Sequence, residues 1–118
     1  MAEQQNTQAR AFAQAAAKLA DERHCTEIAV LDLQGTSPAT DYFVIATGTS
    51  GRQMRTVADE ISEAGRGCGF KRFGRAGYDQ GRWILLDFVD VVVHLFDGEY
   101  REYYDLELLW GDAEKIDY

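Results

Sequence analysis

Two stretches of the chain carry apolar residues at the three- and four-residue spacing of a helix with one buried face. The first covers about residues 5–23 and is rich in alanine. The second begins after Gly48 and ends in GRGCGF, where each glycine would cost about 1 kcal/mol in a helix interior. The apolar positions of this second helix are Met54, Val57, Ala58 and Ile61.

Five shorter segments are predicted to be strands, because they are β-branched or aromatic and are bounded by turn residues. They are residues 26–33, 42–47, 70–73, 82–87 and 91–96. The aromatic and leucine-rich residues 100–110 are expected to add one or two short helical turns. This order is neither a strict βαβ alternation nor an all-β meander. The fold class it predicts is α/β in the wider α+β sense, with a mixed β-sheet of about five strands packed with helices.

The length of 118 residues fits one domain, residues 1–118, since domains of roughly 100–150 residues are the commonest. We expect residues 112–118 to be a mobile tail. The net charge of −8 disfavours direct or sequence-specific binding of nucleic acid, which needs clustered Lys and Arg. Residues 97–118 carry eight acids against two bases. This stretch either favours a basic protein partner or is simply a solvated surface.

The two cysteines, Cys25 and Cys68, lack a CxxC spacing, and there are two histidines to join them in binding a metal. They indicate reduced thiols of a cytosolic protein. The N-terminus is polar and contains acids, and no segment approaches the length of a membrane span. The sequence therefore predicts a cytoplasmic protein without cofactor, metal or membrane contact.

The turn GTSGRQ, residues 48–53, joins a predicted strand to a predicted helix, as many phosphate-binding loops do. It lacks both GxxxxGK[ST] and GxGxxG. A nucleotidyltransferase would also need paired carboxylates for metal ions, and Asp59 and Glu60 point in different directions from one helix. The turn matches a capping box instead, in which Ser50 and Gln53 bond each other's amides. An anion at this helix N-terminus stays an alternative.

The segment RWILLDFVDVVVHLF predicts a hairpin whose two faces differ. If Asp87 and Asp90 flank the connection, Leu86 lies opposite Val91 and Trp83 lies opposite His94. The uniformly apolar face, which belongs to the core, carries Ile84, Leu86, Val91, Val93 and Leu95. The mixed face carries Trp83, Leu85, Asp87, Asp90, Val92, His94 and Phe96. A mixed face suits a helix of the same chain, a second copy or a partner protein, and a slip of one residue would exchange the two faces.

No catalytic constellation is found in the sequence. His94 is interpreted as a structural residue, because no Cys, Ser or second His stands near it in its strand. Asp87 and Asp90 are better explained as turn formers than as an acid-base pair. The serines occur in turns or helices without a nucleophile-elbow pattern. We therefore expect a protein that is not an enzyme.

Three segments resemble the ribosomal silencing factor family, the RsfS or Iojap-like proteins, in this order and spacing: DYFVIATGTS, WILLDFVDVVVHLF and YYDLELLWGDA. The similarity covers about Ile28 to Ala113. It implies a mixed-sheet fold related to nucleotidyltransferases but without their catalytic acids. It also implies that the protein binds large-subunit ribosomal protein fourteen, blocks association of the two ribosomal subunits, and represses translation under nutrient limitation. Members of this family are commonly homodimers when free.

Carried onto this chain, the resemblance places the family's tryptophan at Trp83 and its acids at Asp87 and Asp90. The predicted partner surface is Trp83, Leu85, Asp87, Asp90 and Val92, with Tyr104 and Glu107 as weaker additions. The family usually has D-x-G-D here, whereas this chain has Val89. Since valine disfavours positive φ, we expect a longer or differently bent connection. Two alternatives stay open, a large-subunit assembly factor using the same surface and a nucleotide-binding enzyme of the nucleotidyltransferase-like fold.

Overall fold

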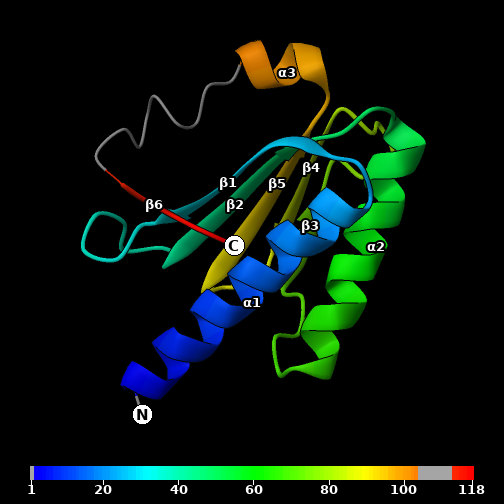
Figure 1. Cartoon of the computed structure of the whole chain (residues 1–118). Coiled ribbons are helices and arrows are strands. Elements are labelled where there is room, and N and C mark those ends of the chain that lie inside the picture. The colour runs from blue at the N-terminus through cyan, green and yellow to red at the C-terminus, as the bar shows by residue number, and fades with distance from the viewer. Residues whose placement is uncertain (1, 104–112) are drawn as a thin grey trace.

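The computed structural model describes residues 2–103 and 113–118 and consists of one mixed sheet with two long helices beside it (Figure 1). The helices are α1 (Ala2–Glu22), α2 (Gly51–Gly67) and the short α3 (Gly98–Tyr103). The strands are β1 (Thr26–Asp32), β2 (Tyr42–Thr47), β3 (Gly74–Ala76), β4 (Trp83–Asp87), β5 (Val91–Phe96) and β6 (Glu114–Ile116). Their order in the sheet is β3-β4-β5-β2-β1-β6, and of these neighbours only β2 and β5 run parallel. The predicted fold class is confirmed, with six strands in place of about five.

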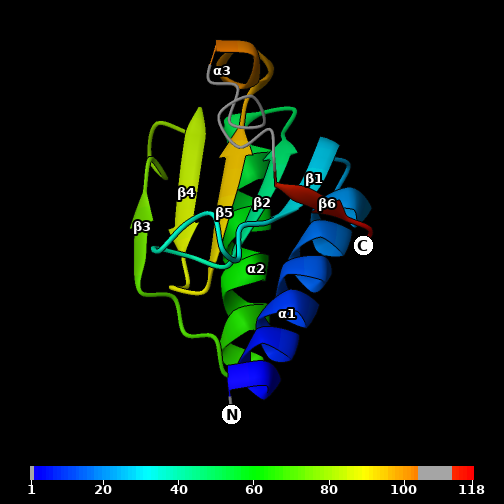
Figure 2. The same ribbon diagram turned by 90° about the vertical axis from the view of Figure 1, so that its left-hand side faces the viewer.

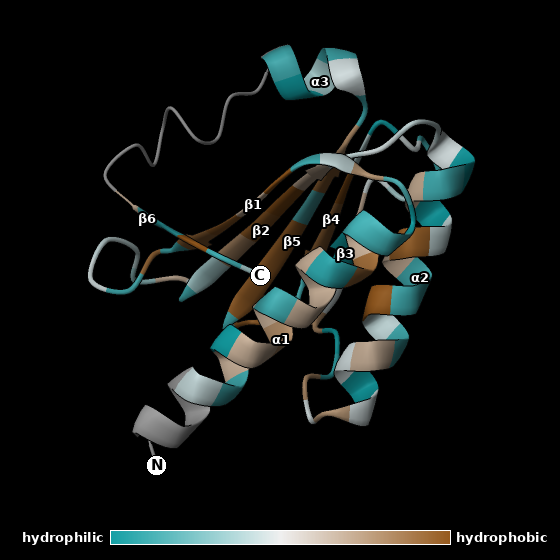
Figure 3. Ribbon diagram, in the orientation of Figure 1, coloured by the Kyte–Doolittle hydropathy of each residue, from teal (hydrophilic) through white to brown (hydrophobic). Residues whose placement is uncertain are grey.

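Both long helices lie against the same face of the sheet, and Figure 2 looks onto the opposite face. The alanines of α1 explain its close packing, because small side chains let the helix approach the strands. Those of its buried face are Ala9, Ala13, Ala16, Ala17 and Ala20. The helix α2 buries the four apolar residues that its periodicity predicted. Figure 3 shows that hydrophobic residues are concentrated in the central strands, between the helices and the open face.

The strand predicted at residues 70–73 is wrong, since the edge strand β3 begins after this segment. Phe70 stacks on Phe12 of α1, with ring centroids 5.1 Å apart. The Arg72 guanidinium donates to the Ser62 hydroxyl of α2 at 3.1 Å. These contacts hold the segment toward the two helices, and its first backbone bond to β4 is the one that the Phe73 amide donates to the Asp87 carbonyl at 2.7 Å.

Residues 113–118, where the sequence predicts a mobile tail, contain the strand β6. Here β6 pairs antiparallel with the outer edge of β1, placing Val30 opposite Ile116. Ile116 is buried, and the Gln14 side chain donates to the Asp117 carbonyl at 2.9 Å. A three-residue strand with one apolar side chain carries too little periodicity to be recognised in sequence, and its partner edge is more than 80 positions away.

The hairpin of β4 and β5 keeps the predicted faces in a different register. Trp83 pairs with Phe96 and Asp87 with Val92, so each partner differs by two residues from the prediction. A shift of two leaves every side chain on its predicted face, because strand side chains alternate. All five residues of the predicted core face are fully buried.

The turn of this hairpin is tight, which contradicts the expected longer connection. Val89 adopts φ 72°, in the left-handed region where glycine is the usual residue. The Asp87 carboxylate accepts a hydrogen bond from the Val89 amide at 2.8 Å, so the prediction that this acid forms the turn is confirmed. The Asp90 carbonyl accepts from the amides of Asp41 and Tyr42 at 3.0 and 3.1 Å, which anchors the turn to β2. These bonds hold Val89 in a conformation that its side chain disfavours.

Candidate functional site

The sheet face that α1 and α2 leave open carries the predicted partner residues that the structure describes. Leu85, Asp87 and Val92 line one groove on this face. Trp83 lies two residues before Leu85 on β4 and so on the same face, and Asp90 lies in the hairpin turn. Tyr104 and Glu107 lie outside the described residues. The structure thus brings Leu85, Asp87 and Val92 together in the groove, whereas Trp83 and Asp90 lie outside its lining.

The groove has a volume of about 600 Å³. The residues that line it are Ser37, Ala39, Thr40, Phe43, Phe73, Leu85, Asp87, Val89, Val92 and His94. The connection between β1 and β2 forms one wall, and Figure 2 shows it in cyan in front of the sheet. On the rim, Phe73 is 79% exposed and Val89 is 52% exposed. Sequence analysis missed Phe73, Phe43 and Thr40, since nothing in the pattern shows that these segments meet β4 and β5.

The floor of the groove includes His94, which is buried beside two aromatic rings. The indole Nε1–H of Trp83 donates to His94 Nδ1 at 3.2 Å, and the Phe43 ring meets the imidazole edge-on at 4.6 Å between centroids. Burial lowers the pKa of His94 to about 4, so the ring is neutral at neutral pH. The interpretation of His94 as a structural residue agrees with its bond to Trp83.

Trp83 is partly buried and is held in position by its neighbours. Its ring stacks on Phe96 with 4.9 Å between centroids, and it packs against the apolar cluster of Leu31, Leu33 and Ile45. A tryptophan fixed in this way can contact a partner without losing much conformational freedom, as interface anchors do.

Acidic side chains gather at the end of the sheet where the hairpin turns, and one of them, Asp87, lines the groove. Burial, followed by the charges of Asp90 and Asp32, raises the pKa of Asp41 above its usual value. None of these four acids forms an ion pair with a Lys or Arg of residues 2–103 and 113–118. This end of the sheet therefore has a negative potential that a basic partner could neutralise.

The turn before α2 caps the helix. The Ser50 hydroxyl accepts from the Gln53 amide at 3.1 Å, as predicted. The Gln53 side chain accepts from the amide of Thr49 rather than that of Ser50, at 2.6 Å, and also donates to the Arg23 carbonyl at 2.7 Å. An anion would have to displace these bonds to use the same amides. Within the described ranges, no group of three His, Cys, Asp or Glu is arranged to hold a metal ion.

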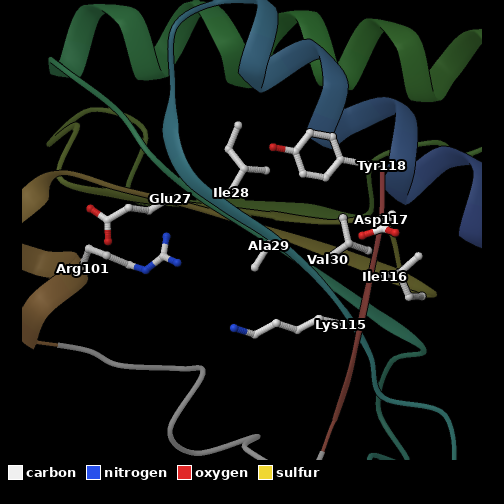
Figure 4. A pocket seen from close by; sticks show the side chains of 9 residues that line it. All are labelled: Glu27, Ile28, Ala29, Val30, Arg101, Lys115, Ile116, Asp117 and Tyr118. Carbon is white, nitrogen blue, oxygen red and sulfur yellow. The ribbon is translucent and has the colours of Figure 1, made fainter.

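A second cavity, of about 620 Å³, lies along the outer edge of β1 between α3 and β6 (Figure 4). Arg101 is buried there and donates to the Thr47 hydroxyl at 3.2 Å. Glu27, Lys115 and Asp117 also line the cavity, so charges of both signs face it. This cavity was not predicted, because a buried arginine has no signature in the sequence. In the described part of the chain, no helix has the length and apolar character needed to cross a membrane.

The fold and the open face define a small mixed α/β protein with a groove on one side of its sheet. The chain belongs to the ribosomal silencing factor family: the family model described as "Ribosomal silencing factor during starvation" matches residues 6–118. The resemblance found in the sequence is thereby confirmed, and the family's name places it in translation regulation.

Relatives support this assignment over most of the chain. The "Ribosomal silencing factor RsfS" of Bacillus subtilis is 41% identical over 102 residues, which is 86% of either chain. The mouse "Mitochondrial assembly of ribosomal large subunit protein 1" is 32% identical over 92 residues, covering 75% of this chain and 40% of the mouse protein. A crystal structure of a Chromobacterium violaceum protein superposes with a TM-score of 0.82 at 29% identity, covering 92% of this chain and 90% of that one.

Proposed function

We propose that this protein is a ribosomal silencing factor that binds the large ribosomal subunit through large-subunit ribosomal protein fourteen. Bound there, it sterically blocks association with the small subunit and represses translation under nutrient limitation. Family membership supports a ribosomal role. The observation that carries the proposal is the open sheet face, which combines a fixed tryptophan, a largely apolar groove and acids that form no ion pair with a Lys or Arg of the described residues.

The mechanism requires contact and no chemical step. Trp83 and Leu85 supply the desolvated anchors, since large apolar side chains at the centre of an interface carry most of the binding energy. Asp87 and Asp90 lie toward the rim, where acids steer a basic ribosomal protein and fix its orientation. A bound domain of 118 residues then occupies surface that the small subunit would need.

Co-sedimentation with purified large subunits tests this proposal. The wild-type protein should pellet with the subunits, and the double variant Trp83→Ala, Asp90→Lys should stay in the supernatant. Far-UV circular dichroism of the variant serves as the folding control, because Trp83 also packs against Phe96. A folded double variant that pellets like the wild type would refute the proposed surface.

An assembly role at the same surface is the second candidate, and the name of the mouse relative, which refers to assembly of the large ribosomal subunit, favours it. Ribosome profiles from a deletion strain separate the two roles. Loss of silencing should alter the ratio of joined to separate subunits in starvation, whereas an assembly defect should accumulate immature large subunits during growth. We also propose that the free protein is a homodimer, which sedimentation equilibrium measures directly.

A further inference from the structure

The groove on the open face has an apolar rim that the folded chain leaves in solvent. Phe73 comes from the segment before β3 and Val89 from the hairpin turn, and both line the groove with largely exposed side chains. Leu85 and Val92 continue the apolar lining inward. Apolar side chains gathered around a groove, unlike apolar residues scattered singly over a surface, mark a place where another molecule binds.

Two polar atoms beneath this lining have no hydrogen-bond partner among the described residues, Thr40 Oγ1 and His94 Nε2. The geometry fixes what His94 can offer. An indole N–H only donates, so the Nδ1 atom that accepts from Trp83 carries no proton, and the ring hydrogen lies on Nε2. His94 Nε2–H is therefore an unused donor, and the Thr40 hydroxyl of the same groove can also donate. Buried polar groups are nearly always paired, which indicates that the missing acceptor comes from outside.

The charges around the groove select the occupant. Asp87 lines it, and burial together with the nearby charge of Asp90 raises the pKa of Asp41. As no described Lys or Arg pairs with them, a lysine or arginine of the occupant would find an unneutralised carboxylate there. The groove thus fits a protein segment that combines an apolar side chain, an oxygen acceptor and a basic side chain.

We infer that one segment of the ribosomal partner enters this groove, with an apolar side chain against Phe73 and Val89, oxygen acceptors for Thr40 and His94, and a basic side chain beside Asp87. The inference rests on the proposed function. It adds that the groove binds a particular segment of the partner selectively, in addition to the anchoring by Trp83. Both polar atoms are shielded from solvent, so side chains that line the groove have to shift when the segment binds.

The test measures affinity for purified large ribosomal subunits together with stability in urea. Thr40→Val keeps the side-chain shape but removes the hydroxyl, and it should bind about tenfold more weakly while unfolding at the same or a higher urea concentration. Thr40→Ser retains the hydroxyl and should bind within about twofold of wild type. This opposite response of affinity and stability is not what a merely structural threonine would give.

A second pair of variants tests the rim. Phe73→Ala should weaken binding about tenfold with little effect on stability, since this side chain is mostly exposed. Tyr118→Ala is the matched control, because it removes another exposed aromatic near the opposite edge of the sheet and should leave binding unchanged.

The outcomes separate this inference from the proposed function. If wild type binds subunits and both Thr40→Val and Phe73→Ala bind equally well, the groove inference fails and the proposed function stands. If wild type itself does not bind, both fail. If Phe73→Ala reduces self-association in sedimentation equilibrium but not subunit binding, the groove belongs to a second copy of this chain, which overturns the inference.

Discussion

Replacing His94 by phenylalanine should flatten the dependence of folding stability on pH. Burial lowers the pKa of His94 from 6.5 to about 4, so between these two pH values the imidazole is protonated in the unfolded chain and neutral in the folded chain. The full stability is present above pH 6.5 and is lost as the pH falls toward 4, because protonation then favours the unfolded state.

The size of the effect can be worked out for an accessible pH range. With these two pKa values, lowering the pH from 7 to 5 costs the wild-type protein about 2 kcal/mol of unfolding free energy through His94 alone. His94→Phe keeps an aromatic ring in the same place, and His94→Gln keeps a polar side chain; neither titrates. Both remove the acceptor of the Trp83 indole and so lower stability at every pH, but neither should show the loss of about 2 kcal/mol between pH 7 and pH 5.

Urea unfolding followed by circular dichroism at pH 7, 6 and 5 measures this difference. Asp41 and the other carboxylates contribute to the profiles of all three proteins, so the difference between wild type and variants isolates His94. Parallel profiles for wild type and both variants would refute the claim that His94 is buried as a neutral ring.

Two further results are expected from the same fold. Ser50→Ala should lower the free energy of unfolding by about 1 kcal/mol, because it removes the cap of α2, and should leave the affinity for large subunits unchanged. Calorimetry with phosphate or nucleotide tests the anion interpretation. Binding to wild type and none to the variant would restore it. With Ellman's reagent at pH 8, the exposed Cys68 should react quickly and Cys25 only in denaturant. Cys25 is buried, and burial followed by the charge of Asp21 raises its pKa to about 11. Two thiols that react quickly in the folded protein would contradict the buried position of Cys25.

The elements with strong periodicity were predictable from the sequence. The spacing of Met54, Val57, Ala58 and Ile61 identified the buried face of α2, and the β-branched run identified β2 with its observed bounds. The hairpin faces were also predictable, because alternation of side chains does not depend on the turn. The register was not, since the position of the turn depends on Val89 accepting a positive φ that sequence rules assign to glycine.

Only some of the residues that line the groove could be predicted from the sequence. Leu85, Asp87 and Val92 belong to one periodic strand pair, so their shared face follows from the pattern. Phe73 and Thr40 enter from irregular segments, whose path is set by tertiary contacts such as Phe70 on Phe12. The strand β6 was missed for the same reason, because its pairing with β1 depends on contacts distant in sequence.

The most direct test of the central claim is a subunit-joining experiment. Purified small and large ribosomal subunits are mixed at a magnesium concentration that favours joining, with and without an equimolar amount of this protein, and are separated on a sucrose gradient. If the protein blocks joining, the joined peak falls and the protein migrates with the large subunit, while the double variant Trp83→Ala, Asp90→Lys leaves the joined peak intact. A joined peak of full height with wild-type protein bound to the large subunit would contradict the proposed function.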